Sequence, residues 1–296
     1  MKPGTTAHRD LFCRTFIDTH ATFEPEALPW PELDALSLER LKAFPLWSYA
    51  RSIEQRAGRM VTAFAQTIDD PVIRQAVALQ GVEEARHGRL MAYVLEHYGI
   101  EAQQLAIPDA PARSEDFKIF GFGECTDSFI GFGAIAIVRQ KRLFPEPLLA
   151  IFDDVLFEEA RHIVFFINWW RYEEARAGRD GFLQRTFETA RYHLRALMGP
   201  AQGAGGGPKL PDIPKERLHA MLDGISPVRF LETALAENRR HMARLDPQLI
   251  KPQLMPALAT LLLTGLRLLP PLPAAAAQPA VAAGHDSAET RSRSAA

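Results

Sequence analysis

Two five-residue segments contain the side chains best suited to chemistry. Residues 83–87 read Glu-Glu-Ala-Arg-His, and residues 158–162 repeat these five residue types 75 positions later. Residues three positions apart on a helix share a face, so the second Glu and the His of each segment can direct a carboxylate and an imidazole at one point. Both groups are common ligands of divalent metal ions, so each segment predicts half of a metal site.

Each segment is preceded by another glutamate at a distance that suits a helical hairpin. Glu54 comes 30 residues before Glu84, and Glu124 comes 35 residues before Glu159. Two antiparallel helices of about fifteen residues on either side of a short turn would return to the same level. The sequence therefore predicts one site for two metal ions. Its ligands would be Glu54, Glu84, His87, Glu124, Glu159 and His162.

The ligand set also indicates the metal. Four buried carboxylates without counter-ions would be very costly, and two divalent cations balance their charge. Mixed carboxylate and imidazole ligation suits iron or manganese better than zinc, which prefers fewer ligands and often thiolates. We expect two iron ions, and the sequence leaves manganese or a mixed manganese and iron pair open. One Glu-x-x-His motif or one glutamate alone would be weak support, so the prediction depends on the repeat and the spacings together.

The elements that must position these ligands are predicted to be helices. From residue 46 onward the apolar residues recur with helical periodicity and lack the alternation of strands, which predicts an all-α fold. Asp70 and Pro71 suit the start of a helix, Ser114 suits an N-cap, and Gly99 and Gly178 suit helix ends. We expect four long helices, at about residues 47–68, 71–98, 114–142 and 148–177.

The rest of the chain is divided by its composition. A fifth helix is expected at about residues 182–198, and the Gly- and Pro-rich residues 199–208 predict a flexible connection. Two or three helices should follow, including one at 227–244. The predicted divisions are an N-terminal segment at 1–45, a helical domain at 46–200, accessory C-terminal helices at 209–270 and a disordered tail at 271–296.

Charge, hydropathy and cysteine content exclude several partners. The chain has 34 Lys and Arg residues against 36 Asp and Glu residues, so nothing attracts it electrostatically to nucleic acid. The apolar run near residues 256–273 is interrupted by Arg267 and is too short for a membrane span, so we expect a packed terminal helix and no membrane. Only two cysteines, Cys13 and Cys125, and a first ten residues without a signal peptide predict a cytoplasmic protein.

The pattern formed by Glu54, residues 84–87, Glu124 and residues 159–162 resembles the six-ligand pattern of the ferritin-like di-iron carboxylate superfamily. This resemblance covers about residues 46–178 and implies a ferritin-like four-helix bundle with additional C-terminal helices. More narrowly, the Glu-Glu-Ala-Arg-His segments are similar to motifs of acyl-carrier-protein desaturases and bacterial multicomponent monooxygenases. Those families activate oxygen, so the resemblance implies an enzyme with dioxygen as co-substrate.

By the same resemblance, the first glutamate of each segment would orient a ligand histidine. Glu83 and Glu158 would accept hydrogen bonds from the imidazoles, and Arg86 and Arg161 would neutralise them. The alternative is that each glutamate forms an ordinary i,i+3 ion pair on the surface with the arginine of its own segment.

Two positions one turn beyond the ligands help to distinguish relatives. Ribonucleotide reductase small subunits commonly have a radical tyrosine one turn after the first ligand histidine, but this chain has Met91 there, so no tyrosyl-radical role is expected. Bacterial monooxygenases often have a hydroxyl residue one turn after the third-helix glutamate, where this chain has Ser128. Ser128 could relay protons as a catalytic residue, and the alternative is a hydroxyl bonded back to a helix carbonyl.

The predicted function is oxidation of a mostly apolar organic substrate, by hydroxylation, desaturation or N-oxygenation. The segment around residues 117–133 alternates Phe with Gly, which either permits close helix packing or leaves space for such a substrate. The alternatives are a ferroxidase or rubrerythrin-like protein that handles iron or peroxide, and a helical scaffold without activity. No flavin or nicotinamide fingerprint is present, so a separate electron-donor protein is expected. The substrate could be free or carrier-bound, and a homodimer is left open.

Overall fold

The computed structural model describes residues 1–105, 107, 113–202 and 224–268 of the 296-residue chain. These residues form nine α-helices, one short 3-10 helix and no strands, so the predicted all-α class is confirmed. The predicted disordered tail at 271–296 lies outside the described residues, as does most of the predicted flexible connection.

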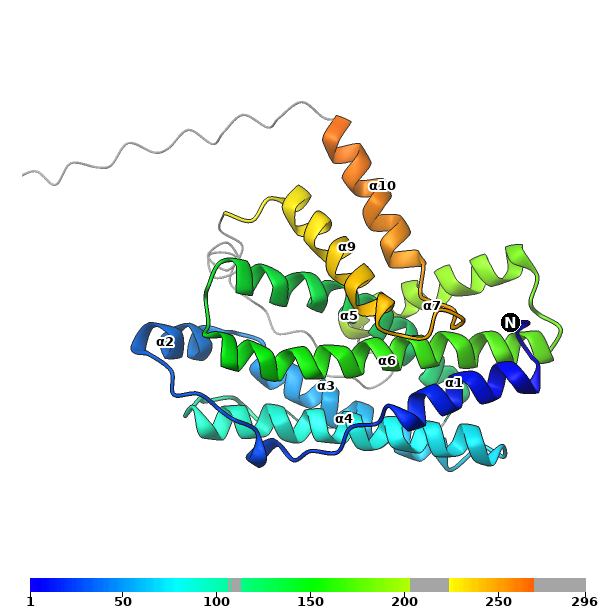
Figure 1. Ribbon diagram of the computed structural model, residues 1–296, viewed down its shortest axis with the longest axis horizontal. Coiled ribbons are helices and arrows are strands. Elements are labelled where there is room, and N and C mark those ends of the chain that lie inside the picture. Colours follow the sequence, from blue (N-terminus) through cyan, green and yellow to red (C-terminus); the bar gives the residue numbers. More distant parts are fainter. Residues whose placement is uncertain (106, 108–112, 203–223, 269–296) are drawn as a thin grey trace, which may run out of the picture.

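Four long helices at the centre of the chain form two antiparallel hairpins (Figure 1). In the first hairpin, α3 (Trp47–Ala65) packs along α4 (Pro71–His97), and in the second, α5 (Ser114–Gln140) packs along α6 (Glu146–Arg176). Contacts of α3 with α5 and of α4 with α6 join the two hairpins. The four predicted ligand-bearing helices are therefore present and packed together.

The first hairpin is held together by an unusually close approach of its two backbones. A Cβ atom added to Gly58 of α3 would lie 2.8 Å from the backbone nitrogen of Ala85, and one added to Gly81 of α4 would lie 3.0 Å from the backbone nitrogen of Thr62. The first distance is shorter than real Cβ atoms show and the second is tighter than most, so glycine permits the close contact at both positions without a shift of the neighbouring backbone. The close contact brings Glu54 of α3 beside the Glu-x-x-His segment of α4.

The glycines of α5 divide into two groups. A Cβ on Gly133 would lie 2.8 Å from the Cβ of Ala234, and one on Gly121 would overlap the ring of Phe166. Around Gly123 and Gly131 the nearest atoms lie at ordinary contact distance, 3.5 and 3.6 Å. Close helix packing therefore accounts for two of the four glycines.

The predicted helix ends are mostly confirmed. Asp70 caps α4 by accepting hydrogen bonds from the backbone nitrogens of Val72 and Ile73, and Pro71 is the first residue of the helix. Gly99 and Gly178 follow α4 and α6 with φ of 58° and 72°, in the left-handed region that favours glycine. Ser114 is not an N-cap as predicted. It is the first residue of α5, because Arg113 occupies the cap position with extended backbone and no side-chain capping bond.

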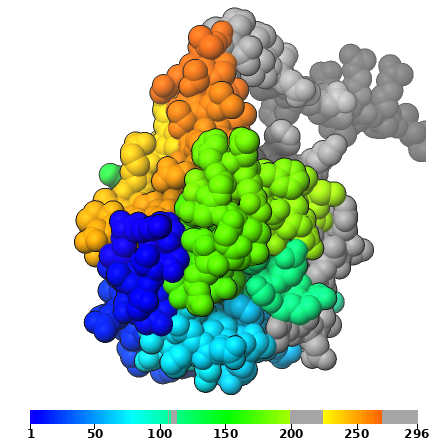
Figure 2. Space-filling view, turned by 90° about the vertical axis from the view of Figure 1, so that its right-hand side faces the viewer, coloured from blue at the N-terminus to red at the C-terminus, as the bar shows by residue number. Residues whose placement is uncertain are grey.

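The N-terminal segment contains two helices that its sequence did not predict. These are α1 (Thr6–Asp18) and α2 (Ala35–Ala43), with the 3-10 helix η1 (Pro25–Ala27) between them. Helix α1 lies against α4 and α6 (Figures 1 and 2). Its side chains Phe12 and Phe16 are buried and pack against Phe165 with ring centroids 5.5 and 4.9 Å apart. Helix α1 is therefore part of the main core.

Three further helices follow the second hairpin. Helices α7 (Phe182–Gln202) and α9 (Pro227–Ala243) pack against α5, and α10 (Leu254–Leu268) packs against α9. Helix α7 continues through Gln202, four residues into the predicted flexible connection. The predicted terminal helix is present as α10, but it is packed on one side only. Its buried residues are Ala259 and Leu263, while Leu261 and Leu268 are 69% and 81% exposed.

Among the described helices, α5 is the one long and apolar enough to cross a membrane. More than half of its apolar window is buried inside the protein, where α5 contacts α6, α7 and α9. Its interior also contains Glu124, a charged residue type that is rare in membrane spans. These features are those of a core helix, and they are compatible with a soluble protein.

The α5–α9 contact buries a histidine whose polar atoms have no partners. Both ring nitrogens of His241 are buried without hydrogen-bond partners in the described part of the chain. The ring stacks on Phe132 with centroids 4.3 Å apart and an interplanar angle of 18°. Burial, together with the charges of Arg240 and Arg244, lowers the pKa of His241 to about 4. The folded protein therefore holds this imidazole in its neutral form.

We predict that His241→Phe removes part of the acid sensitivity of folding. A histidine in the unfolded chain titrates near pH 6.5, so between about pH 6.5 and pH 4 the unfolded chain binds more protons and stability falls as pH falls. The loss at pH 4 should approach about 3 kcal/mol, and Phe should abolish it while retaining the ring stack. Urea unfolding at pH 4.5 and 7.5 measures the difference, with the exposed His97→Phe as control. A wild-type pH dependence in His241→Phe would contradict the prediction.

Candidate metal centre

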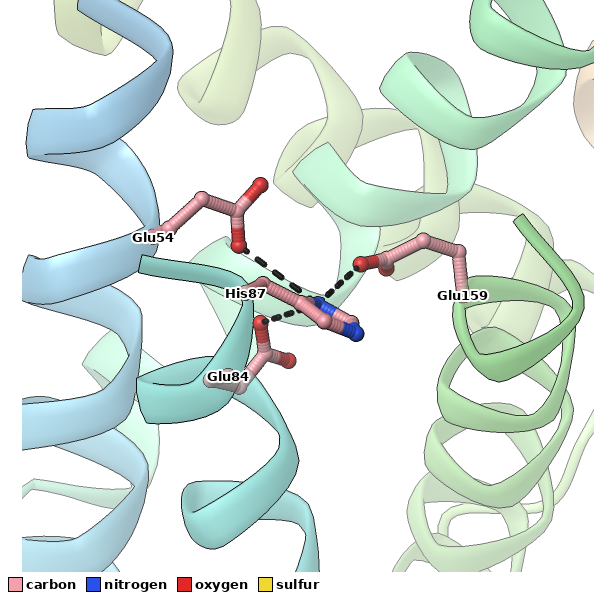
Figure 3. A group of neighbouring side chains, drawn as sticks. All are labelled: Glu54, Glu84, His87 and Glu159. Carbon is pink, nitrogen blue, oxygen red and sulfur yellow. Dashed lines mark ion pairs between the residues drawn. The ribbon is translucent and has the colours of Figure 1, made fainter. Parts of the chain in front are cut away.

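Ligands from three of the four central helices meet at one point (Figure 3). Glu54 of α3, Glu84 and His87 of α4, and Glu159 of α6 present ligand atoms that all lie within 4.8 Å of one another. The side chains of Glu84 and His87 are fully buried, whereas that of Glu159 is 11% exposed and that of Glu54 is 21% exposed. The group is therefore buried, and it is closest to solvent at Glu54.

Two of these carboxylates contact both predicted ligand histidines. Glu159 places Oε1 2.9 Å from Nδ1 of His87 and Oε2 3.4 Å from Nδ1 of His162. Glu84 places Oε1 3.1 Å from Nδ1 of His162 and Oε2 4.0 Å from Nδ1 of His87. The two imidazole rings are 5.7 Å apart between centroids. Each carboxylate therefore directs one oxygen toward each of the two imidazoles.

The atoms that face this space fit a metal ion. Nδ1 of His87, Nδ1 of His162 and Oε2 of Glu159 are buried, and although carboxylate oxygens and imidazole nitrogens lie near one another here, none of these three atoms makes an aligned hydrogen bond in the described part of the chain. Buried polar atoms are normally paired, and atoms left without a partner indicate a missing ligand, water or ion. Oxygen and nitrogen donors that converge without a counter-ion are the donor set of a divalent cation.

The remaining two predicted ligands occupy less central positions. Glu54 Oε2 lies 3.7 Å from Nδ1 of His87, so Glu54 belongs to the His87 half of the cluster. Glu124, like His162, stands outside the group of four. Burial and the nearby charges of Glu159 and Glu84 raise the pKa of Glu124 well above its usual range. Glu124 is therefore close enough to interact electrostatically with the cluster from α5.

The acid of each repeated segment orients the histidine of the opposite segment. Glu83 of α4 accepts a hydrogen bond from Nε2 of His162 on α6, at 2.7 Å. Nη1 of Arg161 donates to both oxygens of Glu83, at 2.9 and 3.1 Å. Because a carboxylate can only accept, the proton of neutral His162 must lie on Nε2. Its Nδ1 lone pair then faces the cluster.

The second acid completes a crossed arrangement. Glu158 of α6 accepts a hydrogen bond from Nε2 of His87 on α4, at 2.8 Å, and another from Arg86. The expected hydrogen bonds from the two imidazoles to the two acids are therefore confirmed, and the alternative of exposed ion pairs within each segment is wrong. All four charged side chains are nearly or fully buried, and each acid pairs with the arginine of the other helix.

The pKa values of these side chains reflect the excess of negative charge in the cluster. Burial raises the pKa of Glu54 to about 7. Burial alone would lower the pKa of His162, but the charges of Glu84 and Glu159 raise it well above its usual value. Burial would likewise raise the pKa of Glu83, but His162 and Arg161 lower it to about 2. In the absence of metal, protons on the inner ligands offset the excess of carboxylate charge.

Two residues that contact the cluster or its acids were not predicted. Nε2 of Gln80 donates to Oε1 of Glu84 at 3.2 Å, from one turn earlier on α4. The sequence feature that could have identified Gln80 is its position four residues before the predicted ligand Glu84, on the same face of the helix. His20 lies 2.6 Å from Glu83 through Nδ1 and Oε1. No sequence pattern marks His20, because it lies in an irregular segment after α1.

Ser128, the predicted proton relay, is buried in α5. Its hydroxyl has no hydrogen-bond partner in the described residues, so the alternative of a bond back to a helix carbonyl is wrong. The structure does not test the relay, which stays a prediction.

Comparisons of the chain with protein-family models, curated proteins and solved structures found no match. The class of the protein therefore rests on its own site. This site is a buried cluster of Glu and His side chains that could hold a metal ion, in a chain whose described elements are all helical.

We predict that Glu83→Gln and Glu158→Gln each weaken metal binding without abolishing it. Gln preserves shape but removes the charge that makes the histidine a better donor. The expected loss of affinity is on the order of 10–100-fold. Competition with a chelator measures it for each variant. The matched control is Glu174→Gln, because Glu174 is also a buried glutamate of α6, paired with Arg179 outside the cluster. Equal affinities in all four proteins would contradict the assignment.

We also predict that metal affinity rises with pH. His87 and His162 have pKa values well above the usual value, and the pKa of Glu54 is about 7, so the metal must displace protons from its ligands. Between pH 6 and 8 the affinity should increase about tenfold per pH unit for each proton displaced. Calorimetric titrations with Co²⁺ in buffers of different ionisation enthalpy count these protons. A pH-independent affinity would show that the site is already deprotonated.

Proposed function

We propose that this chain is a ferritin-like di-iron protein that activates dioxygen. The observation that carries the proposal is the position of Glu84 and Glu159, each of which has one oxygen toward each imidazole. Two carboxylates that are shared by two histidines suit a pair of ions better than a single ion. The supporting architecture is a pair of packed helical hairpins, in which α3, α4 and α6 bring their side chains together and Glu124 of α5 would have to complete the ligand set of a ferritin-like centre.

Charge balance supports two ions. The outer acids, Glu83 and Glu158, are matched by Arg161 and Arg86. In the described part of the chain no arginine is paired with the inner four carboxylates, and two divalent cations would neutralise them. Iron suits this mixture of oxygen and nitrogen donors, while manganese remains a second candidate by the same chemistry.

We propose an oxidase or oxygenase as the activity. Two ferrous ions, when bound, supply electrons that reduce dioxygen. The chain would hold these ions with carboxylates such as Glu84 and Glu159 and with the histidines held in one tautomer, and it would provide a buried hydroxyl at Ser128 that can donate a proton. The apolar and aromatic surroundings of α5 and α6 favour a mostly apolar organic substrate, free or carrier-bound, and a separate protein would supply electrons.

Iron oxidation is the second candidate, and one observation favours it. The cluster is most exposed at Glu54, whose side chain is 21% accessible. An acidic edge that faces solvent offers ferrous ions a direct entry. In that case iron itself would be the substrate.

Anaerobic titration with ferrous iron followed by oxygen tests both proposals. We predict that about two iron ions bind per chain and that oxygen produces an optical change, because the six ligands suit two ions. Glu84→Ala and His162→Ala should lose both responses. One ion or none in the wild-type protein would contradict the di-iron centre. Repeated oxidation of excess ferrous iron, without organic substrate or reductant, would favour the ferroxidase alternative.

A further inference from the structure

We propose that residues 16–23, which join the end of α1 to the following irregular segment, form an outer layer of the metal centre, with His20 as its positioning residue. This inference rests on the proposed metal site but concerns a part of the chain outside the predicted helical domain. Contacts from this single segment reach both crossed pairs of acid and arginine.

The first set of contacts fixes Arg161. Nε of Arg161 donates to Oγ1 of Thr19 at 2.8 Å, and Nη2 donates to the carbonyl oxygen of Phe16 at 2.7 Å. The guanidinium also lies over the ring of Phe16, 4.5 Å from its centroid. With Nη1 on Glu83, the guanidinium is held on three sides. The orientation of the Arg161 guanidinium is therefore set by Phe16 and Thr19 as well as by its own helix, α6.

The second set of contacts reaches Arg86 on the other side of the centre. Nη1 of Arg86 donates to the carbonyl oxygen of Ala21 at 2.9 Å. The guanidinium lies over the ring of Phe23, 4.0 Å from its centroid. Both arginines are thus covered by aromatic rings and bonded to main-chain carbonyls from one stretch of eight residues. This stretch excludes water from the back of the network, which strengthens its charge interactions.

His20 contacts one of the two crossed acids, so the half of the centre beside His162 differs from the half beside His87. Its Nδ1 lies 2.6 Å from Oε1 of Glu83, so Glu83 is bonded to His20, Arg161 and His162. Glu158 has contacts with Arg86 and His87 but none with His20. The histidine side chain is 17% exposed, so it links the buried acid to the surface. We therefore expect His20 to support the ion beside His162 and to leave the ion beside His87 unaffected.

The physical reason lies in the freedom of the Glu83 carboxylate. His20 occupies Oε1, and this leaves Oε2 directed at Nε2 of His162. Without His20 the carboxylate can turn toward Arg161 alone, and His162 then loses the acceptor that fixes its tautomer and raises its basicity. The effect on the metal passes through Glu83, which makes His20 a positioning residue and not a ligand.

Titration with Co²⁺ tests the inference, because its visible absorption reports the number and geometry of bound ions. In His20→Ala, one of the two ions should bind on the order of 10-fold more weakly, with a changed spectrum, while the other binds as in the wild type. His20→Asn, which keeps a donor near the position of Nδ1, should restore most of the affinity. His97→Ala, an exposed histidine of α4, is the control.

Double variants separate positioning from general stability. If His20 acts through Glu83, then His20→Ala should add nothing to Glu83→Gln but should add fully to Glu158→Gln. Should His20→Ala fail to fold, Thr19→Val removes the hydroxyl that accepts from Arg161 and should weaken the same ion. Two ions bound equally well by wild type, His20→Ala and Thr19→Val would overturn the inference while leaving the metal centre intact. No Co²⁺ bound by the wild type would instead overturn the proposed function.

Discussion

An excess of buried negative charge is the constraint on which the rest of this structure depends. Five glutamates meet between α3, α4 and α6, and Glu124 of α5 is close enough to add its charge. In the described part of the chain, the arginines buried with them are Arg86 and Arg161. The free-energy cost of burying an unpaired ionised carboxylate exceeds the net free energy of unfolding of a typical domain. The arginines satisfy the outer pair of acids, and cations or protons must satisfy the inner four. The raised pKa values of Glu54 and Glu124 are a consequence of burial and of this excess negative charge when no metal is bound.

The same constraint explains how the two hairpins are joined. Within a hairpin, close packing holds the helices together, as where Gly58 meets Ala85. Between α4 and α6 the connection is polar, because Glu83 pairs with Arg161 and Glu158 pairs with Arg86. Removing one partner of a buried ion pair typically costs 3–5 kcal/mol, since the other charge is left uncompensated. The crossed pairs therefore fix the relative position of the hairpins and, through it, the positions of the ligands.

Much of the fold could be predicted because its signals are local. Helix periodicity, the Asp70 cap and the glycines at 99 and 178 depend on neighbours in the sequence, and the predicted central helices are present within a few residues. The segments at 83–87 and 158–162 predicted which residues would meet, since helix geometry and hairpin length fix the level of each ligand. These signals do not depend on the identity of the metal.

The parts that could not be predicted depend on residues far apart in the sequence. Glu83 was expected to accept a hydrogen bond from a ligand histidine, but the sequence did not indicate that its partners would be His162 and Arg161 of α6 together with His20, 63 residues earlier. The exposed outer face of α10 is apolar like its packed face, so its sequence does not distinguish them. Helix α1 is short and weakly amphipathic, and its burial depends on α4 and α6 being in place. Local patterns cannot contain information of this kind.

The sequence separation of the contacts around the centre affects how the centre forms during folding. The α3–α4 hairpin joins neighbouring helices, so it can form early at small loop-closure cost. The contact of Arg161 with the Phe16 carbonyl spans 145 residues, so it requires α1 to dock on α6 and has a larger loop-closure cost. Because binding energy at a site that forms only on folding is also folding energy, a metal held by these ligands stabilises the docking of α1 together with the hairpins.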